Sequence, residues 1–235
     1  KVLSSLPEVE EIVISSVREE EIEEGQIAAL ESAVGKCRVL PPLFHPIHLK
    51  AHLRFVPHVV WARFHRDLPY LAAKWVNKEL AWRIASEMRA KSFDVVYIDH
   101  LGMAAYFDLA KQTSPRTRVV LEQHNIESDL FAQFHDRSRG LKRLVAGIES
   151  AKARDFEKDI LRRADAVVAI SDADAEGMKN MAGIEPIVVP QVVSVKKRTW
   201  SRGRSQAVYV GNLAWHPNVE GLDWFAREVW PLVRN

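Results

Sequence analysis

RVVLEQHNIE, residues 118–127, is the stretch that decides the fold class of this chain. Its apolar run, Val119 to Leu121, predicts a short strand buried on both faces of a sheet. The polar residues that follow the run are Glu122, His124, Asn125 and Glu127. In an open α/β sheet, ligands bind beyond the carboxyl ends of the strands. His124 is therefore the first candidate for a functional residue.

The rest of the chain alternates between short apolar runs and segments with helical spacing. Further strands are expected at residues 11–17, 37–40, 93–98, 164–170 and 187–189. Helices are expected between them, at residues 27–34, 74–89, 102–111, 130–134, 141–163 and 171–181. Such alternation implies a parallel sheet with right-handed crossovers. We therefore predict an α/β fold, a Rossmann-like parallel sheet with helices on both faces.

Local details of these helices can also be predicted. Gly35 is a plausible C-cap, and Gly102 allows a helix to start close against the preceding strand. In helix 74–89 the expected buried stripe is Val76, Leu80, Ile84 and Met88. In helix 141–163 it is Leu144, Ile148, Ala151, Phe156 and Ile160.

A change of composition near residue 193 predicts a domain boundary. Residues 1–192 form the first expected domain, and the basic stretch 193–206 reads as a linker. Residues 207–235 begin a second domain, with a strand at 207–210 and an amphipathic helix at 219–229 that Pro231 ends. The chain begins without methionine and stops soon after this new unit starts, so we expect both ends to be incomplete and the first strand to lie upstream.

Composition excludes several classes of protein. With 47% hydrophobic and 27% charged residues the chain is an ordinary globular sequence, and its net charge of +2 gives no sign of a nucleic-acid partner. The single cysteine, Cys37, excludes an intramolecular disulfide and fits a reducing compartment. No apolar run reaches the roughly 18 residues that a transmembrane helix needs. A cytoplasmic location is therefore expected.

Residues 43–70 are rich in histidine, basic and aromatic residues. Such a surface suits peripheral contact with the inner face of a membrane, or a grip on an acceptor. His48 and His52 would share one face of a helix, but no cysteine or carboxylate completes a metal site, and proline interrupts the segment. A solvated loop is the simpler alternative to a metal site.

Two sets of carboxylates have a structural and a functional interpretation. Glu149 and Glu157, about 80° apart around a helix, could form an acid/base pair, but so basic a helix favours surface or interhelical ion pairs. Asp172 and Asp174 resemble a metal-binding D-x-D motif. Ser171 before them, however, predicts an N-cap with acidic residues in the first turn. We favour the structural interpretation of both sets, and no metal is expected.

Three segments together resemble the family 4 glycosyltransferases of the GT-B fold, and look closest to the group that builds bacterial exopolysaccharides. The first is FDVVYIDH (93–100) followed by VLEQHNIE (120–127). The second is the helix bearing the two glutamates, followed by ADAVVAISDAD (164–174) and VVP (188–190). The third, and most specific, is VYVGNLAWHPNVEGLDWFAREVWPLV (208–233). Residues 1–92 match the family only in outline.

The resemblance implies an acceptor-binding N-terminal domain and a C-terminal domain that binds a nucleotide-diphosphate sugar as co-substrate. Transfer to a glycan or lipid-linked acceptor would retain the configuration at the anomeric carbon and use no metal or other cofactor. By the family pattern His124 is the catalytic residue at the floor of the cleft. The residues expected to bind substrate are Asp99, His100, Asn125, Glu127 and Ser171. The backbone N–H groups of Gly211 and Asn212 would face the donor phosphates.

The chain departs from the family pattern in places that matter for activity. Residues 213–217 supply no lysine or arginine for the pyrophosphate, and Pro190-Gln191 replaces the frequent Pro-Asn. The carboxylate pair that binds donor would lie beyond Asn235, so we expect residues 1–235 alone to lack turnover.

Two alternatives come from other classes of function. One is a non-catalytic Rossmann-like module that contacts a lipid carrier or a protein partner through residues 43–70. The other is a nucleotide-sugar epimerase or dehydrogenase, which would need G-x-G-x-x-G and Tyr-x-x-x-Lys motifs that the sequence lacks. A separate, structural interpretation of His124 is that it only hydrogen-bonds a neighbouring loop.

Overall fold

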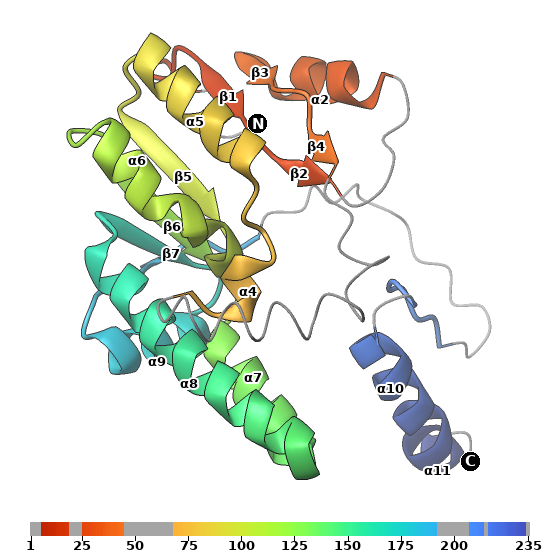
Figure 1. Cartoon of the computed structure of the whole chain (residues 1–235). Coiled ribbons are helices and arrows are strands. Elements are labelled where there is room, and N and C mark those ends of the chain that lie inside the picture. The colour runs from red at the N-terminus through yellow and green to blue at the C-terminus, as the bar shows by residue number, and fades with distance from the viewer. Residues whose placement is uncertain (1–5, 19–24, 45–67, 192–206, 214–215, 234–235) are drawn as a thin grey trace. The chain divides into compact units, whose positions relative to one another are not determined.

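The computed structural model of the chain describes residues 6–18, 25–44, 68–191, 207–213 and 216–233 (Figure 1). The chain divides into two compact units, residues 1–192 and 193–235, and each is considered by itself. Among the described residues, no helix is both long and apolar enough to cross a membrane.

The N-terminal segment forms a small parallel β-α-β arrangement. Strand β1 (Ile12–Ile14) and strand β3 (Cys37–Val39) pair in parallel, and helix α2 (Gln26–Val34) connects them. Gly35 ends α2 at φ 67°, a left-handed value that glycine adopts without strain, as predicted.

The strand expected at residues 11–17 is two short strands instead of one. Strand β2 (Val17–Arg18) pairs with a different partner, strand β4 (Leu43–Phe44). The ladder changes partner opposite Pro41 and Pro42, because proline has no backbone N–H to donate to a neighbouring strand.

The main sheet has four parallel strands in the order β5-β6-β7-β8. They are β5 (Val95–Asp99), β6 (Arg118–Gln123), β7 (Ala166–Ala169) and β8 (Ile187–Val188). The connecting helices are η1 (Leu101–Tyr106), α6 (Phe107–Thr113), α7 (Glu127–Arg137), α8 (Gly140–Arg163) and α9 (Asp172–Ala182). The predicted fold class is confirmed: a Rossmann-like α/β domain with parallel sheets and helices on both faces.

The core lies between the middle strands and the connecting helices. Val119 and Leu121 of β6 are fully buried in one core cluster with Phe107 of α6, Ile160 of α8 and Met178 of α9. A Cβ at Gly102 would collide with the ring of Trp75, so the close approach at this glycine is to the segment after α4 and not to the preceding strand, as had been expected. Strand β5 is less buried than predicted. It alternates, with Ile98 in the core and Val95 and Tyr97 exposed.

The helix expected at residues 74–89 starts later than predicted. Helix α4 (Tyr70–Ala73) precedes it, and α5 (Lys78–Ala90) begins after Asn77, whose Oδ1 accepts hydrogen bonds from the N–H groups of Glu79 and Leu80. This cap places Val76 outside the helix, where it is exposed. The other stripe residues are buried or half-buried, as predicted.

The buried stripe expected on α8 is largely wrong. Leu144, Ile148 and Ala151 are exposed, whereas Phe156 is half-buried and Ile160 is buried, as predicted. The other buried residues of the helix include Ala146, Glu149, Ala153 and Glu157. These positions recur at three- and four-residue intervals, so they share one side of the helix. Alanine lets that side come close to its neighbours, which a row of larger side chains would prevent.

The second unit is mostly helical in its described residues. Residues 207–210 are not a strand, contrary to expectation, and no other strand lies within the described part of this unit to pair with them. Helix α10 (His216–Trp224) continues through a π-helical turn, η2 (Phe225–Val229), into α11 (Trp230–Val233). Pro231 therefore does not end the helix. The wider turn that precedes it relieves the clash between a proline ring and the previous turn.

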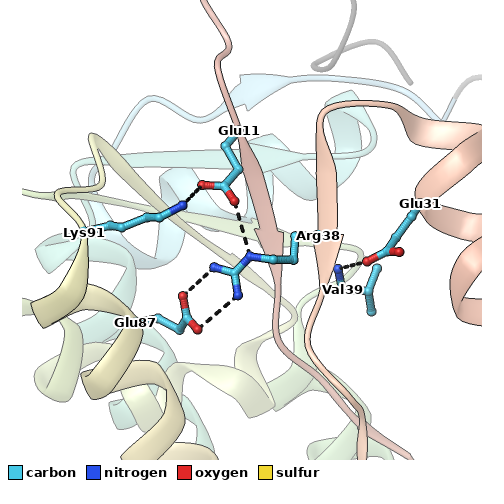
Figure 2. Close-up of polar contacts among 6 residues, drawn as sticks. All are labelled: Glu11, Glu31, Arg38, Val39, Glu87 and Lys91. Atoms are coloured by element: carbon cyan, nitrogen blue, oxygen red, sulfur yellow. Dashed lines mark hydrogen bonds and ion pairs between the residues drawn. The ribbon is translucent and has the colours of Figure 1, made fainter.

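Four charged side chains tie the N-terminal strands to α5 (Figure 2). Arg38 of β3 donates two hydrogen bonds to Glu87 of α5, with N–O distances of 3.1 and 2.6 Å. Glu11 accepts from Arg38 at 3.3 Å and from Lys91 at 2.6 Å. The hydrogen bonds from Arg38 lower the pKa of Glu87, and the bond from Lys91 is the largest cause of the lowered pKa of Glu11.

We expect Arg38→Met to reduce the free energy of unfolding by about 1 kcal/mol, a small value because solvent screens this half-exposed network. Arg38→Lys should lose the two-pronged geometry and recover only part of that loss. Because the pKa values of both glutamates are lowered, the stabilisation is present above about pH 4.3 and disappears as the pH falls through the lowered values.

Urea unfolding at low and high salt measures the effect. Arg116→Met is the matched control, because Arg116 is exposed in a loop and no described residue pairs with it. An Arg38→Met loss that does not shrink at high salt would contradict an electrostatic role for the network.

Candidate functional site

The polar residues singled out in the sequence lie where three neighbouring strands end. Asp99 is the last residue of β5 and His100 follows it, His124 follows β6, and Ser171 comes two residues after β7. Because β5, β6 and β7 are adjacent and parallel, these ends share one edge of the sheet. This edge is the candidate site.

His124 lies at the centre of a polar cluster. Its Nε2 atom is 3.5 Å from Oδ1 of Asp99 and 3.6 Å from Oε1 of Glu122. The ring centroids of His124 and His100 are 4.1 Å apart, with the rings tilted by 55°. Strand register produces this geometry, because Asp99 pairs directly with Glu122. The register of two adjacent strands thus brings these side chains together.

His100 adopts a backbone conformation that residues with a side chain rarely use. Its φ is 68°, in the left-handed region, which costs an ordinary residue about 1 kcal/mol. Its N–H donates to the carbonyl of Glu122 at 3.0 Å, and its own carbonyl accepts from the N–H of Met103 at 3.0 Å. These bonds hold the turn from β5 into η1, which brings the His100 ring beside His124. Strain of this kind concentrates at functional sites.

Tyr97 belongs to the same surface but was not among the predicted site residues, and Glu122 was noted only as one of the polar residues after the strand. The hydroxyl of Tyr97 donates to Oε2 of Glu122 at 2.7 Å. Partial burial of the ring, and next the carboxylate of Glu122, raise the pKa of Tyr97, so the hydroxyl stays a donor. The signal was present in the sequence: Tyr97 is two residues before Asp99, so both side chains leave β5 on one face.

Three other predicted site residues, Ser171, Asn125 and Glu127, have positions in or before helices and are not part of the His124 cluster. Ser171 caps α9: its hydroxyl accepts from the N–H of Asp174 at 3.2 Å and hydrogen-bonds the Asp174 carboxylate. Capping therefore accounts for the D-x-D sequence, as predicted. Asn125 is half-buried in the loop before α7, and Glu127 is the first residue of that helix. Within the described residues, no hydrogen bond or ion pair joins Ser171 or Asn125 to the His124 cluster.

Gly211 and Asn212 belong to the second unit and are described within it. Both residues are exposed. The side-chain amide of Asn218 donates to the carbonyl of Asn212 at 3.0 Å, which closes the turn before α10.

The prediction that the two helix glutamates form ion pairs holds for Glu149, which pairs with Lys152, and is wrong for Glu157. It is fully buried, and its carboxylate accepts three hydrogen bonds. The donors are Nε2 of Gln123 at 2.8 Å, the N–H of Glu127 at 2.9 Å and the N–H of Ser128 at 3.0 Å. Residues 124–126 are thus held from both sides by one carboxylate. Burial raises the pKa of Glu157, although the N–H donors oppose the rise.

Glu149 has the same kind of role two turns earlier on α8. Its Oε2 atom accepts from the N–H of Tyr70, the first residue of α4, at 2.8 Å, and Lys152 lies 3.9 Å from the other oxygen. Both glutamates therefore cap the starts of other helices, where unpaired N–H groups attract negative charge. The sequence could not show this because the capped helices lie 79 and 29–30 residues away.

Ile126 completes the support of the loop that carries His124. It packs against the hydrophobic core, and a Cβ at Gly177 of α9 would collide with its Cδ1. Glycine at position 177 therefore leaves the space that this side chain occupies.

Three members of the cluster could also hold a divalent cation. One ligand atom from each of Asp99, His100 and His124 lies within 4.8 Å of the others. Imidazole and carboxylate are ordinary zinc ligands, so a cation added in excess would compete for His124. His48 and His52, the other histidines considered as ligands, lie outside the described residues.

We expect Glu157→Ala to reduce the free energy of unfolding by about 3 kcal/mol, because it leaves three buried N–H groups unpaired. Glu157→Gln keeps one acceptor oxygen and should lose about 1 kcal/mol at neutral pH. Because burial raises the pKa of Glu157, the free energy of unfolding of the wild type exceeds that of Glu157→Gln by the most below about pH 4.3. Its advantage over the glutamine variant should shrink as the pH rises through the raised pKa.

Urea unfolding between pH 4 and pH 7 measures this difference. Glu87→Gln is the matched control with the opposite sign, because the pKa of Glu87 is lowered and its contribution disappears on the acid side. A wild-type advantage over Glu157→Gln that grows with pH would contradict the burial of this carboxyl.

We expect His100→Gly to be more stable than His100→Ala by about 1 kcal/mol, because glycine takes a positive φ without strain. Thermal unfolding of the two variants tests this order. An alanine variant as stable as the glycine variant would show that the turn is not left-handed.

Comparison with known proteins agrees with this architecture. Residues 31–197 match the model of Glycosyltransferase Family 4, which covers more than half of the chain and includes the whole edge that carries Asp99, His100, His124 and Ser171. No curated protein sequence matched the chain. With its Rossmann-like fold and this match, the chain belongs to Glycosyltransferase Family 4.

Proposed function

We propose that this protein is a retaining glycosyltransferase. It moves a hexose from a nucleotide-diphosphate sugar to a glycan or lipid-linked acceptor, in bacterial cell-surface polysaccharide synthesis at the cytoplasmic side of the membrane. Residues 1–192 carry the acceptor side of the site, residues 193–206 link the domains, and residues 207–235 begin the donor domain. The observation that carries the proposal is the His124 cluster at the carboxyl edge of the sheet, in a chain of this family.

The cluster has the chemistry that sugar hydroxyls require. Each hydroxyl both donates and accepts a hydrogen bond. The carboxylates of Asp99 and Glu122 are acceptors, and the imidazoles of His100 and His124 can each donate from one nitrogen and accept at the other. A partly exposed edge with both kinds of group can orient a sugar ring by several hydroxyls at once.

In the proposed reaction, the bond from the anomeric carbon to the leaving phosphate oxygen breaks. A bond to the acceptor oxygen forms on the same face of the sugar, and the acceptor hydroxyl gives up its proton. His124 is the group we assign to orienting that hydroxyl and receiving or passing on its proton. Asp99 and Glu122 lie close enough to stabilise the imidazolium that would result.

The other assignments follow from position. Asp99, His100, Asn125, Glu127 and Ser171 are proposed to contact substrate. The N–H groups of Gly211 and Asn212 are proposed to bind the donor diphosphate, which would make a metal unnecessary for neutralising its charge. We propose no metal or other cofactor for the reaction.

We expect His124→Ala to lower kcat at least 100-fold, the usual contribution of a positioned acid–base group. The assay is sugar transfer from UDP- and GDP-sugars by the full-length protein. The melting temperature should change little, because the His124 side chain is partly exposed and outside the core.

Gln112→Ala is the matched control, since Gln112 is exposed near the end of α6, at the opposite edge of the sheet. Full activity of His124→Ala would remove His124 from the mechanism. Absence of any nucleotide-sugar binding, together with retained binding to lipid or protein, would replace the enzyme with a non-catalytic module.

A further inference from the structure

Helices α7 and α8 form an antiparallel hairpin with an apolar stripe that no described part of the first unit covers. On α8 the stripe consists of Leu141, Leu144 and Ile148, which are 75%, 62% and 44% exposed. On α7, Leu130 and Phe134, four residues apart, are also exposed. Figure 1 shows the two helices projecting together beyond the sheet.

Helix geometry explains why this stripe cannot join the core. At 100° per residue, it lies roughly 140° around α8 from the row of Ala146, Glu149 and Ala153. That row is the buried side of α8, which packs against the sheet and contacts α4 through Glu149. The stripe therefore faces away from the core, and burying it requires something outside the described part of this unit.

The end of the hairpin is also strongly basic. Residues 134–148 contain four cationic side chains, Arg137, Arg139, Lys142 and Arg143, and one acidic residue, Asp136. All four cations are exposed, and none forms a hydrogen bond or ion pair with another described residue. Elsewhere on the described surface, arginines often pair along their own helix, as Arg83 does with Glu79 and Arg163 with Asp159. The cations of the hairpin are left available for an external anion.

We propose that the end of this hairpin is a docking surface for an anionic lipid bilayer. This hairpin tip comprises Leu130, Phe134, Arg137, Arg139, Leu141, Lys142, Arg143, Leu144 and Ile148. Leucine and phenylalanine side chains enter the boundary between headgroups and acyl chains, while lysine and arginine meet the anionic headgroups. Each cation near such a surface strengthens binding about fivefold.

A bilayer fits these residues better than a protein partner does. Protein interfaces are depleted of charge at their centre. Here Lys142 and Arg143 follow Leu141 in the first turn of α8, at about 100° and 200° around the axis, so cationic side chains surround the apolar one at the end of the hairpin. The basic end of the tip, at Arg137, is about 15 Å along α7 from Glu127.

Vesicle co-sedimentation of the 235-residue chain tests the proposal. Binding to phosphatidylcholine vesicles that contain 30% phosphatidylglycerol should be at least 10-fold stronger than binding to pure phosphatidylcholine. The triple variant Arg139→Gln, Lys142→Gln, Arg143→Gln should weaken it on the order of 100-fold. Leu141→Ser with Leu144→Ser should weaken it at least 10-fold at both low and high salt.

The matched controls remove exposed cationic and apolar side chains that lie outside the hairpin tip. Arg89→Gln with Arg116→Gln removes two exposed cations that no described residue pairs with, and Trp82→Ser removes an exposed apolar side chain of α5. Both controls should bind within twofold of the wild type. Equal loss in the controls and the tip variants, or no vesicle binding by the wild type, would overturn the proposal.

Two further measurements separate docking from loss of fold and from self-association. An environment-sensitive dye on Leu144→Cys, in a Cys37→Ser background, should shift to shorter wavelength when anionic vesicles are added; an unchanged spectrum overturns the proposal. In sedimentation without vesicles, the wild-type chain should not self-associate through the tip. If the wild type self-associates and Leu141→Ser with Leu144→Ser abolishes that association, a second copy of the chain covers the tip and the bilayer proposal is wrong.

Discussion

A buried carboxylate organises the part of the molecule on which the site depends. The carboxylate of Glu157 accepts hydrogen bonds from the side-chain amide of Gln123 and from the N–H groups of Glu127 and Ser128. These donors lie before and after the short loop that carries His124, so one side chain of α8 sets both ends of that loop. A carboxylate is costly to bury, and it is tolerated here because the start of α7 offers N–H groups that need an acceptor.

Strand pairing and one strained turn place the remaining site residues. Direct pairing of Asp99 with Glu122 puts two carboxylates beside His124, and the left-handed turn at His100 brings a second imidazole to the group. The cluster thus combines a regular feature, the register of parallel strands, with a strained one. Helix α8 serves two functions in this arrangement, since one side supports the loop and another carries leucines that no described part of the first unit covers.

Sequence periodicity predicted the sheet well and the helix faces less well. Strand β6 and the caps at Gly35 and Ser171 depend on neighbours in the chain, and they form as expected. The stripe of α8 was misjudged because its buried side is built from alanine and glutamate, whereas its leucines are exposed. Hydrophobicity alone selects the wrong side when small residues make the closest contacts.

The sequence by itself determined the α/β class, the family and the placement of Asp99, His100 and His124 at strand ends. The class and the strand ends follow from local patterns of apolar and polar residues, and the family from its motifs and the match over residues 31–197. Only the tertiary structure decided that Glu149 and Glu157 cap distant helices and which side of α8 is buried. Those outcomes depend on contacts between residues far apart in the chain, where the energy of burying a charge depends on donors that no local pattern reveals.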